Sequence, residues 1–290
     1  MQNPDLPKTR NIEEIKIHLS AAFRNIALVD SSGRSLSNLV KDIINSDSAT
    51  IRTGNFATHE TFFFEHYSVR RLSHQLNEAC NKLAACLELV NIHHQGEKVF
   101  KTFSKNFISG TLIPTLYYSQ ISAMVAILCG FGCISFRHYK TDGNYFLIRI
   151  NNGWVLRERS TYIRKTLGKT VKGWHAEAIT SYETLKELGY ELPGIDISKV
   201  NSLKTERNRY HYYILGDLSM YGYYGLKPFF EHVPLVLQTI HEGLRILNAI
   251  QRDRVITNRF DDIINNIGII YKNCGEDASF LSSFKDPIIV

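Results

Sequence analysis

Polar side chains with the potential for chemistry are concentrated between Lys204 and Gly216, in the stretch KTERNRYHYYILG. Arg207 and His211 are four positions apart, so on an α-helix their side chains are separated by about 40° around the axis. Lys204 precedes Arg207 by three positions and extends the same stripe. A stripe of lysine, arginine and histidine without an acidic residue on the same face is suited to bind an anion.

This pair of side chains is chemically suited to RNA. Histidine has a pKa near neutrality and can move a proton to or from a ribose 2′-hydroxyl or a leaving 5′-oxygen. Arginine stays charged and can hold a phosphate while negative charge develops on it. A transesterification by Arg207 and His211 would need no metal and no cofactor. The simpler alternative is that both residues solvate a helix face or bond a neighbouring helix, and spacing alone leaves both open.

Signatures of other chemistries are missing from the sequence. Neither the GxxxxGK[ST] loop nor a GxGxxG turn after a strand is present. Cys129 and Cys133 form one loose pair, and the adjacent His93 and His94 project from different faces, so no zinc site is predicted. The carboxylates form no pair suited to a two-metal nuclease. We therefore predict no metal and no cofactor.

The composition is that of a folded protein with a modest excess of positive charge. A hydrophobic fraction of 44% and a charged fraction of 21% exclude a disordered chain. The net charge of +6 and the pI near 9.0 favour anionic partners, although no block of five or six basic residues occurs. Five cysteines without framework spacing, and charges where a signal peptide needs its apolar core, predict a cytoplasmic protein.

One long segment, Asn106 to Phe136, carries no charge across 31 residues. It is long enough to span a bilayer. However, Pro114, several polar residues and the break at Gly130 and Gly132 favour a buried core helix that begins near Thr115. We therefore expect no membrane partner.

Apolar periodicity predicts an all-α helical bundle. The expected helices cover Phe62–Ile92, Thr115–Gly132, Gly173–Gly189, a helix capped by Asp196 or Ser198 that runs toward Gly222, Pro228–Arg252 and Asn258–Asn273. Two β-rich runs around Asn-Asn-Gly predict a small hairpin over residues 145–158. We expect one or two peripheral helices up to about Glu60. Residues 1–105 are interpreted as an N-terminal helical extension that packs on the core, and residues 106–290 as the main helical domain.

Two stretches of the chain resemble the HEPN superfamily, the helical domains of many prokaryotic ribonuclease toxins and defence proteins. The signature of that family is an arginine followed by a polar residue and, a few residues later, a histidine that often belongs to His-x-Tyr. Arg207, Asn208, His211 and Tyr213 occupy those places. The helix LYYSQISAMVAILCGFG, Leu116–Gly132, is similar to the apolar family helix that opens with paired aromatics and ends at glycine.

The resemblance extends over roughly Thr115 to Ala249. The polar loop SFRHYKTDGNYF, which contains His138, is similar in character to the loop that joins the two middle helices of the family. The sequence departs from the family in one respect, since three residues separate Arg207 from His211 where four to six are usual. On an unbroken helix one missing residue rotates the histidine by about 100°. A local bulge, or the use of another histidine, would be needed to restore the usual geometry.

The resemblance implies an all-α HEPN-like fold and a metal-independent endoribonuclease that works as a homodimer. Motif helices from two subunits would face each other across a cleft, and RNA cleavage would leave a cyclic phosphate. Arg207 and His211 would be catalytic, and Asn208 would orient Arg207 or the substrate. Substrate binding would fall to Lys204, Arg209 and Tyr213, and Tyr213 is also a candidate site of control by a partner.

Three readings of the function remain open from the sequence. The first is this ribonuclease, a toxin or antiphage-defence effector with RNA and a regulatory or antitoxin protein as partners. The second is a non-catalytic HEPN-like module that binds RNA, a nucleotide or a protein through the same basic stripe. The third sets the resemblance aside and treats the chain as a helical interaction protein, with the uncharged stretch as core or membrane contact.

Overall fold

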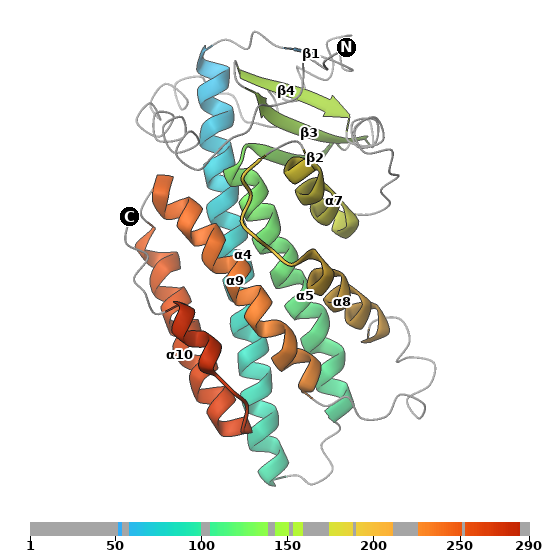
Figure 1. The fold of residues 1–290 in the computed structure, drawn as a ribbon, viewed down its shortest axis with the longest axis vertical. Coiled ribbons are helices and arrows are strands. Elements are labelled where there is room, and N and C mark those ends of the chain that lie inside the picture. The colour runs from blue at the N-terminus through green and yellow to red at the C-terminus, as the bar shows by residue number, and fades with distance from the viewer. Residues whose placement is uncertain are drawn as a thin grey trace. The chain divides into compact units, whose positions relative to one another are not determined.

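The computed structural model describes nine stretches of the chain (Figure 1), namely residues 52–53, 58–99, 105–138, 143–150, 153–158, 174–187, 190–210, 226–250 and 253–284. Most of these residues are helical, which confirms the predicted all-α class for the body of the fold. The helices are α4 (Thr58–Val99), α5 (Lys105–Gly130), α7 (Trp174–Glu187), α8 (Ile197–Asn208), α9 (Lys227–Ile250), α10 (Arg254–Cys274) and the 3-10 helix η2 (Ser279–Phe284). The peripheral helices expected before Glu60 lie almost entirely outside the described residues.

A four-stranded antiparallel sheet accompanies the helices. Its strands are β1 (Arg52–Thr53), β2 (Cys133–His138), β3 (Gly143–Ile150) and β4 (Gly153–Glu158), in the order β1-β4-β3-β2. The predicted hairpin is confirmed, because Tyr145 pairs with Glu158 and Ile150 pairs with Gly153. The sheet is nevertheless larger than that hairpin.

The polar stretch around His138, expected to be a loop, contributes to two paired strands instead. Phe136 of β2 pairs with Tyr145 of β3, and His138 pairs with Gly143. Aromatic and β-branched residues such as those of CISF favour a pleated strand. A further strand also stabilises a hairpin that would be marginal by itself.

The chain divides into two compact units. The first comprises residues 1–74, 125–193 and 249–252, and the second comprises residues 75–124, 194–248 and 253–290. The sheet and α7 belong to the first unit, whereas α8, α10 and η2 belong to the second, and α4 and α5 contribute residues to both. The predicted division after residue 105 stays a prediction, because most of the chain before α4 lies outside the described residues.

Helix α5 begins at Lys105, ten residues before the predicted start, and contains Pro114 in its interior. An interior proline removes one helical hydrogen bond and costs about 3 kcal/mol. The flanking side chains Leu112, Ile113 and Leu116 are almost completely buried. Burying each such side chain contributes roughly 1.5–3 kcal/mol, which is enough to offset the proline.

The other end of α5 follows the prediction. The helix stops at Gly130, and Gly132 adopts a left-handed φ of 74° that turns the chain into β2. Among the described residues, Gly110–Gly130 is long and apolar enough to cross a membrane, and 83% of its apolar window is buried inside the protein. Core helices pass the same test of length and composition, so this finding leaves the expected localisation untested.

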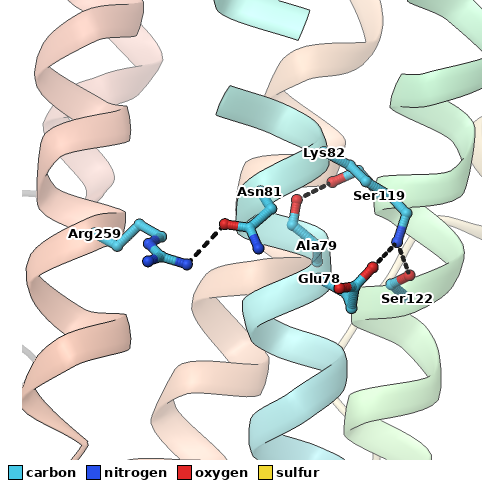
Figure 2. Close-up of polar contacts among 7 residues, drawn as sticks. All are labelled: Glu78, Ala79, Asn81, Lys82, Ser119, Ser122 and Arg259. Atoms are coloured by element: carbon cyan, nitrogen blue, oxygen red, sulfur yellow. Dashed lines mark hydrogen bonds and ion pairs between the residues drawn. The ribbon is translucent and has the colours of Figure 1, made fainter. Parts of the chain in front are cut away.

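In the second unit, polar side chains join α4 to α5 (Figure 2). Ser119 donates to the carbonyl oxygen of Ala79 at 2.7 Å. Lys82 bridges Glu78 on its own helix, at 2.7 Å, and Ser122 on α5, at 3.3 Å. These bonds fix the register of two helices whose apolar faces would tolerate sliding.

Helices α9 and α10 pack against α4 and α5 in the same unit through a close approach and polar contacts. Gly243 of α9 lies against the side chain of Leu76 on α4. Gln120 of α5 donates to Thr239 of α9 at 2.9 Å inside the core. Arg259 of α10 reaches Asn81 of α4 at 2.7 Å (Figure 2). The second unit is therefore a bundle of α4, α5, α9 and α10 segments, and α8 is placed against it.

Candidate functional site

Helix α8 positions the predicted motif, and its beginning agrees with the sequence. Asp196 is the N-cap and accepts hydrogen bonds from the backbone N–H of Ser198, at 3.0 Å, and of Lys199, at 3.2 Å. The hydrogen bond from the Ser198 hydroxyl, together with that from the Lys199 backbone, lowers the pKa of the Asp196 carboxyl. The cap therefore stays ionised at neutral pH and fixes where the helix starts.

The buried face of α8 decides where Arg207 lies. Val200, Leu203 and Arg207 are the buried residues of the helix, at spacings of three and four that form one face. Val200 and Leu203 are completely buried, and Arg207 is 8% exposed. The arginine therefore continues the apolar face of α8 instead of projecting into solvent.

The guanidinium of Arg207 is held between α8 and α5. Its Nη1 donates to Oδ1 of Asn208 at 2.8 Å, and its Nη2 donates to the hydroxyl of Tyr118 at 2.8 Å. Its Cζ lies 5.5 Å from the ring centroid of Tyr118 and 5.7 Å from that of Tyr117. Two consecutive tyrosines of α5 thus contact an arginine 89 positions further along the chain.

The electrostatics of this cluster favour a charged arginine beside a neutral Tyr117. Burial raises the pKa of the Tyr117 hydroxyl to about 12, and the charge of Arg207 acts in the opposite direction. Tyr117 is therefore protonated at physiological pH. Partly desolvated contacts between a guanidinium and an aromatic ring contribute on the order of 1–2 kcal/mol. Hydrogen bonds to a charged group contribute about 1.5–3 kcal/mol.

The other predicted residues of α8 differ in their surroundings. Lys204 is half-buried one turn before Arg207. Arg209 is exposed and forms an ion pair with Glu206 at 2.8 Å. Exposed pairs of this kind contribute only about 0–1 kcal/mol, so the pair leaves Arg209 able to contact another anion.

The predicted His211 and Tyr213 lie outside the described residues. The site therefore brings together Arg207 and Asn208, with Lys204 on the preceding turn. The roles that the sequence predicts for all six residues stay predictions.

The helix changes its winding immediately after Asn208. Arg209 and Tyr210 form part of a π turn, and the backbone of Arg209 remains right-handed helical, with φ −56° and ψ −52°. A π turn closes over five residues instead of four, so it rotates by less than about 100° per residue. A local bulge would be needed to compensate for the short spacing between Arg207 and His211. This π turn acts in the opposite sense, because it uses one more residue per turn, whereas the sequence already has one residue fewer between Arg207 and His211 than the family pattern.

Sequence reasoning did not find the two tyrosines. In the sequence, Tyr117 and Tyr118 stand out only as the paired aromatics at the predicted start of an apolar helix. The usable signal was on α8, because the spacing of Val200, Leu203 and Arg207 already places the arginine on the face that must pack against something. An aromatic helix is a suitable partner for a buried guanidinium.

In the part of the chain that the structure describes, no three or more His, Cys, Asp or Glu side chains are grouped so that they could share a metal ion. The prediction of chemistry without metal or cofactor stays a prediction. No protein-family model matches the chain, and the searches of curated proteins and of solved structures likewise found no match. The fold and the site define a mostly helical protein in which Arg207, at the C-terminal end of α8, is held against Tyr117 and Tyr118 of α5.

Proposed function

We propose that this protein is a metal-independent endoribonuclease of the HEPN type, in which Arg207 and His211 act together on an RNA phosphodiester. The observation that carries the proposal is the meeting of two sequence stretches at one side chain. The paired tyrosines in the middle of α5 and the Arg-Asn pair of α8 belong to the two stretches that resemble that family, and Tyr118 and Asn208 each bond the Arg207 guanidinium.

A fixed arginine suits the chemistry of phosphodiester cleavage. The 2′-oxygen attacks phosphorus, the bond to the 5′-oxygen breaks, and negative charge grows on the non-bridging oxygens between these events. A guanidinium that is already oriented stabilises this charge without reorganising, and one such donor is worth about 10²–10³ in rate. His211 would accept the 2′-hydroxyl proton or donate one to the leaving 5′-oxygen, which contributes about 10²–10⁴. The products are a 2′,3′-cyclic phosphate and a 5′-hydroxyl.

The π turn at Arg209 and Tyr210 directly follows the Arg-Asn pair of α8. Bulges of this kind occur frequently at functional sites, which supports a functional role for this end of the helix.

The remaining parts of the proposal follow the resemblance. A second copy of the chain would supply a second Arg207 and His211 across a cleft, and Lys204 and Arg209 would attract the RNA backbone. The protein would act in the cytoplasm as a toxin or antiphage-defence effector, under control by a regulatory or antitoxin protein.

One observation favours a second candidate function, a non-catalytic module that binds RNA, a nucleotide or a protein. Arg207 is 8% exposed and bonds across to α5. A side chain in that position stabilises the packing of two helices whether or not chemistry takes place. A ribonuclease should cleave RNA and lose this activity when His211 is replaced, whereas a binding module should not cleave RNA.

Expression in a bacterial host tests the proposal. We expect wild-type protein to arrest growth and fragment cellular RNA, and Arg207→Ala and His211→Ala to abolish both effects. Lys199→Ala is the matched control, since Lys199 is exposed on the same helix and has no role in the proposed site, so cleavage should stay within about threefold of wild type. RNA that stays intact with wild-type protein, together with retained RNA binding by purified protein, would select the binding module.

A further inference from the structure

Tyr118 contacts the proposed catalytic arginine in two ways. Its hydroxyl accepts a hydrogen bond from Nη2 of Arg207 at 2.8 Å, and its ring centroid lies 5.5 Å from Cζ. The side chain is half-buried on α5, whereas Arg207 is on α8. Tyr118 therefore holds the guanidinium from a helix other than the arginine's own.

Because of the geometry of a guanidinium, this contact affects the orientation of the whole group. The group is planar and its nitrogens are rigidly related, so fixing both Nη atoms fixes the orientation of the plane. Asn208 holds Nη1, but it is the neighbouring residue on the same helix and moves with Arg207. The bond to Tyr118 ties the second Nη atom of this plane to another helix, α5.

Tyr117 provides a natural comparison on the same helix. Its ring centroid lies 5.7 Å from Cζ of Arg207, almost as near as that of Tyr118, and the two tyrosine rings are inclined by 58°. Tyr117 is completely buried. Tyr117 therefore contacts the guanidinium through its ring, whereas Tyr118 contacts it through its ring and also accepts a hydrogen bond from Nη2.

We propose that Tyr118 is a positioning residue, whose hydroxyl sets the orientation of the Arg207 guanidinium toward the scissile phosphate. This inference rests on the proposed ribonuclease function. Tyr118 does not touch the reacting atoms and acts through Arg207. Losing its hydroxyl leaves the arginine charge in place but removes the bond that orients the plane from α5, so it weakens transition-state stabilisation more than RNA binding.

Tyr118→Phe isolates this role, because it removes the hydroxyl and keeps the ring. We expect kcat to fall by about 10- to 100-fold with KM within about threefold of wild type, since misplacing a catalytic group by about 1 Å costs up to 10²-fold. Tyr117→Phe makes the same chemical change at the adjacent position and should leave kcat within about threefold. Equal kcat values for the two variants, or a rise in KM alone for Tyr118→Phe, would overturn the assignment.

Nuclear magnetic resonance of ¹⁵N-arginine-labelled protein tests the same inference without relying on cleavage. We expect the two Nη groups of Arg207, assigned with Arg207→Lys, to give separate signals in wild type and in Tyr117→Phe. The signals should broaden and move together in Tyr118→Phe as rotation of the guanidinium becomes faster. If wild type cleaves no RNA but shows this pattern, the proposed function fails while the positioning role stands. Averaged Nη signals in wild type would overturn the positioning role even if RNA is cleaved.

Discussion

Replacing Gly243 by alanine tests whether helices α9 and α4 pack as closely as the structure shows. A Cβ atom at position 243 would lie 2.6 Å from Cδ2 of Leu76, and 3.5 Å and 3.7 Å from its Cγ and Cδ1. Carbon atoms pack favourably at about 3.5–4.0 Å, so the new methyl group overlaps Cδ2 by roughly 1 Å. Leu76 is completely buried and must change its rotamer or push α9 away.

Two opposing terms set the expected size of the effect. Inserting a methyl group into a well-packed core costs about 1–3 kcal/mol. Alanine is favoured over glycine inside a helix by about 0.8–1.0 kcal/mol. We therefore expect Gly243→Ala to lower the free energy of unfolding by about 0–2 kcal/mol in the wild-type background.

In the Leu76→Ala background, the expected effect of Gly243→Ala on the free energy of unfolding changes sign. That substitution costs about 2–5 kcal/mol itself, but it removes every atom that the new methyl group would overlap. Gly243→Ala should then stabilise the protein by about 1 kcal/mol through helix propensity. The double-mutant cycle thus predicts a coupling free energy of about 1–3 kcal/mol.

Urea denaturation followed by circular dichroism measures all four proteins. We expect the transition midpoint to shift while the slope m stays constant. An equal effect of Gly243→Ala in both backgrounds would show that Leu76 is not the neighbour that limits this position, and would refute the close approach of α9 and α4.

Three further predictions concern caps, thiols and pH. Asp253 caps α10 by accepting from two backbone N–H groups at 3.1 Å, so Asp253→Ala should cost about 1 kcal/mol in urea denaturation, and no change in midpoint would refute the cap. The half-buried Cys274 should react with Ellman's reagent in the native protein, whereas the other four thiols should react only after denaturation. Fast reaction of more than one thiol in the native protein would contradict their burial. Those four buried cysteines are Cys80, Cys86, Cys129 and Cys133. Burial lowers the pKa of His232 below its ordinary value of 6.5, so the unfolded state binds this proton more readily, and the free energy of unfolding should fall as the pH drops below about 6.5. His232→Gln should reduce that dependence between pH 7.5 and 5, and an unchanged pH slope would contradict the assignment.

Local signals in the sequence predicted the ends of several elements. Asp196 caps α8 because a carboxylate can reach two backbone N–H groups within three residues, and α5 stops at Gly130 because the following chain must adopt a left-handed φ. The hairpin of β3 and β4 was likewise predictable from two β-rich runs around Asn-Asn-Gly. Each of these features depends only on neighbouring residues.

Features that depend on tertiary packing were missed. Pro114 marked a helix start by local rules, but the burial of its neighbours carries α5 through it. The additional strands could not be inferred, since Arg52 of β1 pairs with Leu156, more than a hundred positions away. Long-range pairing leaves little trace in a single sequence.

The candidate site shows the same division. The contact of Arg207 with Asn208 joins adjacent residues, and the expectation that the asparagine orients the arginine is compatible with the 2.8 Å bond. The contact with Tyr118 joins residues 89 positions apart, and no spacing rule connects them. The buried face of α8 indicated that Arg207 packs against a partner, but only the fold reveals which partner.

Cleavage of a defined RNA by purified protein is the most direct test of the proposed ribonuclease activity. A single-stranded, end-labelled RNA oligonucleotide is compared with the same sequence carrying 2′-deoxyribose at every position, in the presence of EDTA. We expect wild type to cleave the RNA but not the deoxy oligonucleotide and to leave 2′,3′-cyclic phosphate ends, and we expect Arg207→Ala and His211→Ala each to be slower by at least about 100-fold. Equal cleavage by wild type and Arg207→Ala, or cleavage of the deoxy oligonucleotide, would contradict a ribonuclease centred on this arginine.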